Sequence, residues 1–498
     1  MSLTMVVDAG TTNFKMGVID YQGQILAKCS QTVDLKRPES GAVMHDPADL
    51  YLIFKELVAE LGPDYKAAIK TIVFSGYQFG FMPMGVDDQP LTGMITLLDT
   101  RSKAVMPVLE EKLPFVKIYE KTGCPPLFTY ILARLIWLKK YKPKIFAQSN
   151  WFADIKSFFI NKLCGERVTE PSIAAVTQLY NLYNQKWDPE LLDMAGITAK
   201  QLPRVVSGDK IVGKLNPDRA RELGLGIDVS ILPGVYDGGS MIIGMGGYEN
   251  NFGICNLGTS GMLRVCSSQP LIDDPQKRRL QTYSLTEDKY AIGGGINNAG
   301  VTLRWYKNNL AGNDSYQEII ERAARVAPGA GGLFCFPFLT GERDPRVGNL
   351  ASASFFGIKE HHDKGHLARS LLEGIGYTLN LIKEALQENG VTLKKIIIGG
   401  TASKDDPWCQ ILADIFNTPV TKALSGDSAL VGGAIMAAKV AGKYGSIKEA
   451  GERMVKLGRE FSPAQDNAEI YQKHYLFFKK MIANYQDFYR VHSRDFDG

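Results

Sequence analysis

Two short segments of this chain, far apart in sequence, carry residue types that bind phosphate groups. Residues 8–12 read Asp-Ala-Gly-Thr-Thr and are followed by Lys15, and residues 258–260 read Gly-Thr-Ser. Each segment follows an apolar run typical of a β-strand. Turns of this kind expose backbone N–H groups and hydroxyls that can donate hydrogen bonds to phosphate oxygens. We therefore expect a nucleotide to be held between two similar halves of the chain.

Two aspartates lie beside small residues at strand ends and are candidates for the chemistry. A carboxylate at Asp8 can hold Mg²⁺ beside nucleotide phosphates, although an ordinary β-turn would use an Asp equally well. Asp237 lies where an apolar run meets a helix start. It can cap that helix, or act as a general base for a hydroxyl that attacks a γ-phosphoryl group. In the second case we expect Gly238 and Gly239 to leave room for the substrate.

The bulk properties exclude several other classes of protein. The net charge of +4 on 498 residues gives no reason to expect binding to nucleic acid or to a membrane surface. No apolar run is long enough to span a bilayer, and no signal peptide is recognised, so we expect a cytoplasmic protein. The seven cysteines form no CxxC pair, which favours free thiols over a disulfide framework or a zinc site.

A repeated order of predicted elements must position these groups. Strands are predicted at 4–8, 14–20, 25–29 and 69–75, with a helix at 47–61. The order recurs in strands at 252–257, 261–266 and 395–400 and in helices at 365–388, 405–416 and 429–441. This weak duplication predicts two similar α/β domains, at 1–247 and 248–498. His361 and His362 lie in a polar turn before one of these helices and His366 lies at its start; a solvated loop fits this cluster better than a metal site.

Taken together, the motifs resemble those of the FGGY family of carbohydrate kinases. The resemblance spans essentially the whole chain and rests on segments 8–12, 236–238, 258–260, 341–343 and 399–420. It implies two ribonuclease-H-like domains around a central cleft, as in the actin, hexokinase and heat-shock-protein ATPase superfamily. It also implies ATP- and Mg²⁺-dependent phosphorylation of a sugar, polyol or sugar acid. A homodimer is common in similar proteins.

The resemblance assigns roles to individual residues of this chain. It implies that Asp237 is the general base and that Asp8 lies by the metal. The residues it places near ATP are Thr11, Thr12, Lys15, Gly258, Thr259, Ser260, Gly399, Gly400, Thr401 and Asn417.

The identity of the acceptor is the least determined part of this prediction. Gln78 and Phe79 stand where similar gluconate and xylulose kinases usually carry Met-His, and Asp99 and Arg101 remain from a Trp-x-Asp-x-Arg element. Arg101 could pair with the carboxylate of an aldonate, or could be a surface residue. The segment around Asn298 looks nearest to the gluconate kinase branch, so gluconate is the first choice.

Three alternatives stay open at this point. The chain could be a xylulokinase or another pentulose or polyol kinase. It could phosphorylate a polyhydroxylated signal that is not a sugar. It could also be a nucleotide-binding regulator without catalysis, which would not need the Asp237 carboxylate. Release of ADP that depends on a sugar separates a kinase from a regulator.

Overall fold

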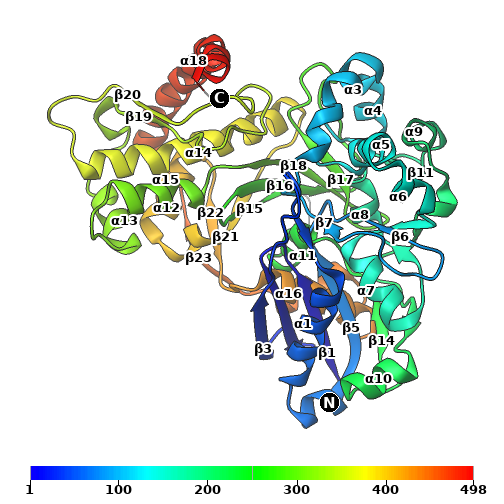
Figure 1. Cartoon of the computed structure of the whole chain (residues 1–498). Coiled ribbons are helices and arrows are strands. Elements are labelled where there is room, and N and C mark those ends of the chain that lie inside the picture. Colours follow the sequence, from blue (N-terminus) through cyan, green and yellow to red (C-terminus); the bar gives the residue numbers. More distant parts are fainter. Residues whose placement is uncertain (1, 249–250, 497–498) are drawn as a thin grey trace.

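The computed structural model describes residues 2–248 and 251–496, and its framework is two β-sheets (Figure 1). The first sheet has the strand order β13-β14-β5-β1-β2-β3. These strands are β1 (Leu3–Ala9), β2 (Asn13–Ile19), β3 (Ile25–Thr32), β5 (Ile69–Gly76), β13 (Gly213–Lys214) and β14 (Ser230–Leu232). β1 pairs antiparallel with β2 and parallel with β5, and β14 is parallel to β5 on its other side.

The second sheet repeats this arrangement. Its order is β17-β18-β16-β15-β21-β22-β23. The strands are β15 (Phe252–Leu257), β16 (Gly261–Ser267), β17 (Gln281–Ser284), β18 (Tyr290–Ile296), β21 (Lys395–Gly400), β22 (Val420–Ala423) and β23 (Leu457–Phe461). β15 pairs antiparallel with β16 and parallel with β21, as β1 does with β2 and β5. The predicted repeat of hairpin, helix and parallel strand is confirmed, whereas the boundary at 247/248 adjoins residues outside the described part.

The predicted helices are also present, each with a local reason to begin where it does. α1 (Pro47–Ala59) starts with a proline and is capped by Asp46, which accepts a hydrogen bond from the Ala48 N–H. α14 (Lys364–Glu388) is capped by Asp363, so the turn with His361 and His362 directly precedes the helix, and His366 lies in its first turn. α15 (Asp406–Phe416) and α16 (Ser428–Val440) match the remaining two predicted helices.

Helices α11 (Asp237–Gly244) and α16 join the two halves. Their side chains form one buried cluster that includes Val6 of the first sheet and Ile254 of the second. The two helices approach closely enough for their backbones to meet. A methyl group on Gly244 would overlap the Ser428 carbonyl, and one on Gly432 would overlap the Ser240 carbonyl. Glycine is required at both positions because no side chain fits between these helices.

Two regions had no counterpart in the sequence prediction. The first is a helical region beside the first sheet, drawn in cyan to green in Figure 1. It contains α3 (Met106–Lys112), α4 (Phe115–Thr122), α5 (Ile131–Tyr141), α6 (Pro143–Gln148), α7 (Ile155–Cys164), α8 (Pro171–Ala175) and α9 (Pro189–Ala195). It also contacts the second sheet, because the Tyr130 and Tyr283 hydroxyls lie 2.8 Å apart and the Tyr119 hydroxyl donates to the Leu280 carbonyl.

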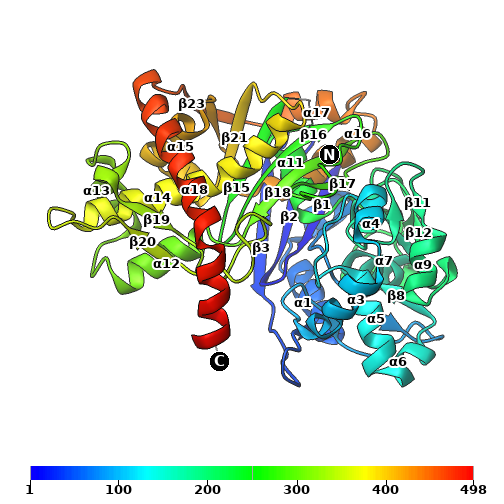
Figure 2. The same cartoon turned by 90° about the horizontal axis from the view of Figure 1, so that it is seen from above.

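The second unpredicted region is α18 (Gln465–Phe496), which packs on the outer helices of the second half (Figure 2). The remaining helices are α2 (Pro63–Ala68), α10 (Pro217–Leu223), α12 (Gly300–Asn309), α13 (Tyr316–Ala324) and α17 (Ile447–Met454). Short strands outside the two sheets include β4 (Met44–His45), β6 (Met82–Met84), β7 (Met94–Ile95) and β8 (Trp151–Ala153). All seven cysteines are free thiols. Within the described ranges, no helix combines the length and the apolarity that a membrane span requires.

Candidate active site

The two predicted catalytic carboxylates lie at one edge of the first sheet. Asp8 lies near the end of β1, opposite Ser75 of β5. Tyr236 forms a parallel bridge with Gly76 on the other side of β5, and Asp237 follows as the first residue of α11. Because β1, β5 and β14 run parallel, their carboxyl ends meet at this edge, where open α/β sheets bind ligands.

Asp8 is held by β5 and flanked by a lysine. The Ser75 hydroxyl donates a hydrogen bond of 3.0 Å to the Asp8 carboxylate. Loss of water around the half-buried carboxyl raises its pKa above the ordinary value, while this hydrogen bond and the Lys15 charge act in the opposite direction. Lys15 lies opposite Asp8 in the register of β1 and β2. Its ammonium group is 3.9 Å from Asp427, the residue that precedes α16.

Asp237 titrates near neutral pH because of its surroundings. Loss of water raises its pKa from 3.8 to about 7, and the nearby negative charge of Asp8 acts in the same direction. The Gly238 N–H, which donates a hydrogen bond of 2.7 Å, and the positive charge of Lys156 both lower this pKa. A carboxylate with a pKa near the working pH is suited to take up and release a proton during turnover.

The glycines after Asp237 do not leave the room expected from the sequence. A methyl group on Gly238 would lie 2.6 Å from the Tyr236 ring, and one on Gly239 would lie 2.7 Å from the Leu285 side chain. The protein itself fills this space, so the expectation that Gly238 and Gly239 make room for a substrate is wrong. Their physical role is to let Tyr236 pack over the start of α11.

The first phosphate-type turn is tightly anchored. The Gly10 N–H donates to the Asp8 carbonyl at 3.1 Å, and a methyl group on Gly10 would lie 2.6 Å from the Asn13 carbonyl oxygen. His45 is fully buried, and its Nε2 lies 2.9 Å from the Thr11 carbonyl. The Val33 N–H donates to the Thr12 carbonyl. Hydrogen bonds to its carbonyls hold the turn in place, so its N–H groups and hydroxyls can face the exposed side.

The second phosphate-type turn is anchored by α12. The Gly300 N–H donates to the Gly258 carbonyl at 2.9 Å, and the Val301 N–H donates to the Thr259 carbonyl at 3.0 Å. Gly300 approaches so closely that a methyl group there would overlap the Gly258 carbonyl. The side chains of Thr259 and Ser260 are exposed.

Gly399 and Gly400 lie beside this turn, as β21 pairs with β15. Gly400 opposes Leu257, has a φ of 78°, and would overlap the Leu257 carbonyl if it carried a side chain. Thr401 follows and is exposed. The structure therefore brings the second turn and residues 399–401 together at the carboxyl edge of the second sheet.

The structure does not bring Asn417 to this edge. Asn417 ends α15 in the left-handed region, with a φ of 43°, whereas Gly400 lies before the start of that helix. The eleven residues of α15 extend for about 16 Å at 1.5 Å per residue, and Asn417 lies at the end of this helix that is farther from Gly400 along the chain. Asn417 instead lines a cavity of about 260 Å³ between α14, α15 and α18.

Gln78 and Phe79 have the features of a site that reads a substrate. In the described structure, the buried Nε2 of Gln78 has no hydrogen-bond partner. Phe79 has a φ of 67°, a region that is strained for a large side chain. The guanidinium of Arg134, which is 2% exposed, donates to the Phe79, Ile95 and Thr96 carbonyls and so holds this backbone in place.

Arg101 and Asp99 bind mainly to each other and to their own loop. The Arg101 guanidinium lies 2.8 Å from Asp99 and 2.6 Å from Glu39, and it stacks at 4.5 Å on the Trp137 ring. Asp99 also accepts the Val43 N–H at 3.0 Å. Two carboxylates already neutralise Arg101, so the structure gives it a role in joining loops rather than a free charge for an aldonate.

Asn298 is likewise satisfied within the protein. Its side-chain amide donates to the Gly341 carbonyl at 2.7 Å and to Glu342 at 3.2 Å, and its oxygen accepts the Thr340 N–H at 3.2 Å. The residue is fully buried. Asn298 thus fastens the segment 340–342 beside α12, and the geometry offers it no free group for a substrate.

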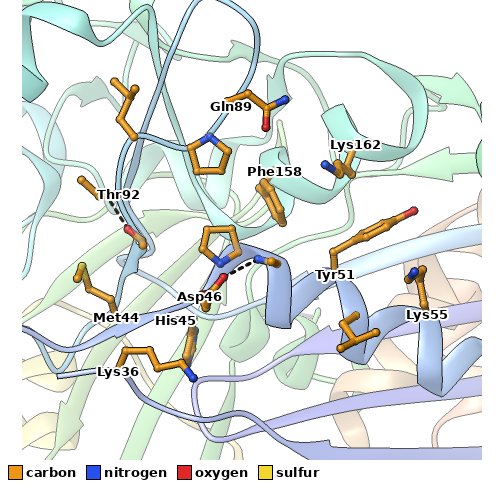
Figure 3. A pocket seen from close by; sticks show the side chains of 16 residues that line it. Lys36, Met44, His45, Asp46, Tyr51, Lys55, Gln89, Thr92, Phe158 and Lys162 are labelled. Carbon is orange, nitrogen blue, oxygen red and sulfur yellow. Dashed lines mark hydrogen bonds between the residues drawn. The ribbon is translucent and has the colours of Figure 1, made fainter. Parts of the chain in front are cut away.

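A cavity of about 630 Å³ lies between α1, α7 and the loop that contains residues 89–93 (Figure 3). Tyr51, Lys55 and Lys162 gather at one end of it, and Lys36 lies at the other (Figure 3). None of the residues predicted for catalysis or for substrate binding lines this cavity. Its wall includes His45, which contacts the first phosphate-type turn.

A magnesium ion that arrives with the nucleotide fits the carboxylates present. No group of three metal-binding side chains occurs among the described residues. Mg²⁺ at kinase sites, however, uses one or two carboxylates and completes its shell with phosphate oxygens and water. Asp8, with one hydroxyl donor and a half-buried carboxyl, meets this requirement.

Comparison with known proteins identifies the family. The model of the FGGY carbohydrate kinase N-terminal domain matches residues 3–244, and that of the C-terminal domain matches residues 253–441. A gluconokinase of Bacillus licheniformis is 30% identical over 97% of this chain and 98% of its own length.

Two solved structures show the same architecture. A ligand-bound xylulose kinase from Lactobacillus acidophilus is 28% identical with a TM-score of 0.94, over 97% of this chain and 98% of that one. A gluconate kinase from the same organism is 28% identical with a TM-score of 0.93, over 98% of this chain and 100% of that one. The chain belongs to the FGGY family of carbohydrate kinases and has the two-domain fold of the actin and hexokinase type. It is an ATP-dependent phosphotransferase with an alcohol group as acceptor.

Two charged residues near the site escaped the sequence analysis. Arg134 is the single charge in the apolar run 131–138, and Lys156 is the single charge in 155–160. Both are buried, at 2% and 1% exposure. A lone charge inside an apolar helix is the signal that could have found them, because such a charge needs a specific partner.

Proposed function

We propose that this carbohydrate kinase transfers the γ-phosphoryl group of ATP to a hydroxyl of gluconate. Gln78 carries the proposal: this half-buried residue lies at the position expected to read the acceptor, and its amide Nε2 has no hydrogen-bond partner among the described residues. A carboxylate or hydroxyl oxygen of a sugar acid would complete that hydrogen bond. The similarity to gluconokinase over nearly the whole chain supports the same choice.

In the proposed reaction, Asp237 takes the proton from the acceptor hydroxyl. The hydroxyl oxygen then forms a bond to the γ-phosphorus as the bond from that phosphorus to ADP breaks. The turns at 8–12 and 258–260 bind phosphate oxygens through N–H groups and hydroxyls, and the backbone at Gly399 and Gly400, packed against Met245 and Leu257, forms the edge beside which the nucleoside binds. Asp8 holds Mg²⁺, which when bound neutralises charge on the phosphates.

A panel of acceptors tests the proposal directly. ATP-dependent ADP release would be measured with gluconate, xylulose, ribulose, glycerol and erythritol. We expect gluconate to have the highest kcat/KM, by roughly tenfold or more. A substrate without a suitably placed oxygen would leave the hydrogen-bond donor of Gln78 unpaired. A higher value for xylulose would contradict the choice of gluconate but retain the kinase. ADP release that no acceptor stimulates would favour a regulatory protein.

Xylulose is the second candidate acceptor, because the xylulose kinase from Lactobacillus acidophilus has the same architecture. A variant of Gln78 tests whether this residue binds the acceptor. Gln78→Leu should lower kcat/KM for gluconate about 10- to 100-fold by removing the hydrogen-bond donor, with the KM for ATP unchanged. Gln89→Leu, in the separate cavity of Figure 3, is the matched control and should leave both parameters unchanged. An unaltered kcat/KM for gluconate in the Gln78 variant would remove that residue from acceptor binding.

A further inference from the structure

A buried ion pair lies behind Asp237, and the predicted site does not account for it. The Lys156 ammonium group lies 2.5 Å from the Glu170 carboxylate, and the two side chains are 1% and 0% exposed. Burial of two charges costs free energy that their mutual attraction returns only when further hydrogen bonds are made. Apolar residues of similar volume often stabilise a fold equally well. Stability alone therefore gives no reason for these charges at this place.

Glu170 connects the ion pair to the segment that carries Asp237. Its carboxylate accepts the Ser172 N–H at 2.6 Å, the Ile173 N–H at 3.1 Å and the Ser172 hydroxyl at 2.8 Å. The same Ser172 oxygen accepts the backbone N–H of Tyr236 at 2.9 Å. Tyr236 directly precedes Asp237. A continuous hydrogen-bonded route thus runs from the ammonium group to the peptide before the base.

Lys156 also reaches this segment from the other side. A methyl group on Gly76 would lie 2.9 Å from Lys156 Cγ, so the lysine stem passes directly over the end of β5. Gly76 is the residue that bridges to Tyr236. Tyr236 precedes α11 without any side-chain cap, and it is the point where the sheet edge becomes a helix. Lys156 therefore supports Tyr236 through Gly76, and Glu170 with Ser172 supports it through the hydrogen bond.

We propose that Lys156, Glu170 and Ser172 are positioning residues that hold the base Asp237 at the edge of β5. The inference rests on the proposed role of Asp237. A general base must lie within hydrogen-bond reach of the hydroxyl that it deprotonates. A displacement of about 1 Å can lower the rate on the order of 100-fold without any loss of binding. Release of the Tyr236 N–H would allow such a displacement.

Two variants interrupt the route at different points. Ser172→Ala removes the hydroxyl that links Glu170 to Tyr236 but leaves the ion pair in place. Lys156→Met combined with Glu170→Gln replaces the ion pair by a neutral pair, so no unpaired charge stays buried. Ser370→Ala is the matched control, because Ser370 is equally buried and, among the described residues, its hydroxyl donates to the Leu367 carbonyl of its own helix. Asp237→Asn is measured beside them as the reference for loss of the base.

We expect both route variants to lower kcat by roughly tenfold or more, with the KM for ATP and for the acceptor within about twofold. The stoichiometry of ATP binding should stay at the parent value, and Ser370→Ala should keep the parent kcat. An unchanged kcat in Ser172→Ala would overturn the proposal. A kcat that falls only as far as the stoichiometry of ATP binding falls would also overturn it, because the loss would then come from unfolded protein.

Failure of the base assignment gives a different result. If Asp237→Asn keeps the parent turnover, then Asp237 is not the base and the proposed mechanism fails. If Asp237→Asn is inactive while Ser172→Ala is fully active, only the positioning route fails. Ser172→Ala decides the question by itself if the double variant does not fold, because it changes neither charge.

Discussion

At the scale of single residues, the chemistry of Asp237 depends on its surroundings rather than on its type. Its pKa is raised to about 7 by loss of water and by the charge of Asp8. An aspartate in water would be ionised at neutral pH and would be a weak base. Loss of water and the charge of Asp8 also mean that the ionised Asp237 side chain lowers the stability of the folded state. The site thus trades stability for basicity, as active sites commonly do.

Asp237→Asn should therefore stabilise the protein while it abolishes turnover. With the folded pKa raised, the penalty on the aspartate is absent below its unfolded pKa of 3.8, grows with pH, and is complete above about 7. We expect the variant to be more stable at pH 8, by on the order of 2 kcal/mol after solvent screening. Unfolding by urea at pH 5, 6.5 and 8 measures this. A stability difference that does not grow with pH would contradict the raised pKa.

Gly400 is a residue at which the backbone conformation should matter for the proposed nucleotide site. Gly400→Ala places a methyl group against the Leu257 carbonyl at a φ of 78°. We expect a loss of about 1–3 kcal/mol in stability and a higher KM for ATP, because the edge that receives the nucleoside must shift. Gly426→Ala is the control, since no atom lies within 4 Å of the added methyl group. Equal KM values for ATP in the two variants would exclude Gly400 from the nucleotide site.

At the scale of elements, the site depends on helices that hold strand ends in place. α5 supplies Arg134, whose guanidinium binds the carbonyl of the strained Phe79. α12 fixes the second phosphate-type turn through the Gly300 and Val301 N–H groups. α11 carries Asp237 at its first position, and its placement is set by contact with α16. Each helix thus determines the position of one functional segment.

The contact between α11 and α16 should tolerate no added atom. Gly432→Ala would push a methyl group into the Ser240 carbonyl of α11 and displace the helix that carries Asp237. We expect a loss of roughly 1–3 kcal/mol in stability together with a lower kcat. Gly451→Ala in α17 has open space around it and should stabilise the protein by about 0.5–1 kcal/mol. Thermal unfolding and kcat are measured for both variants, and only Gly432→Ala should lower both. Parent-like stability in Gly432→Ala would show that the helices can move apart.

At the scale of the whole molecule, the groups proposed for catalysis are divided between the two halves of the chain. Asp8 belongs to the first sheet and Asp237 begins the helix at its edge, whereas the turn at 258–260 and Gly399 belong to the second sheet. Ion pairs between distant segments join the two parts: Lys28 lies 2.8 Å from Asp427. In the proposed reaction, groups from both halves act on one phosphoryl group, so the distance between them should affect the rate.

We expect ATP and the acceptor together to draw the two halves closer. Ligands that bridge both sheets stabilise the arrangement in which both sets of contacts are made. Small-angle X-ray scattering should show a smaller radius of gyration with gluconate and a non-hydrolysable ATP analogue than with either alone. The variant Asp237→Asn, which should retain binding, allows the same measurement with ATP itself. An unchanged radius of gyration at saturation with both ligands would contradict closure.

The sequence alone determined the parts of this protein that depend on local pattern. Alternation and apolar runs located the strands, and Gly-Thr-rich turns after them located the two turns that we propose bind phosphate, since these signals involve residues adjacent in the chain. The order of these motifs was sufficient to place the chain in its family. Asp8 and Asp237 were identified before their proximity was known.

Only the tertiary structure decided how those residues are paired and charged. Arg101 and Asn298 proved to be occupied by Glu39, Asp99 and the segment 340–342, and Asn417 lies at the far end of α15. The pKa of Asp237 and the route from Lys156 likewise depend on residues distant in sequence. Burial and electrostatic interactions are set by neighbours in space, and no local pattern specifies which distant segments become neighbours.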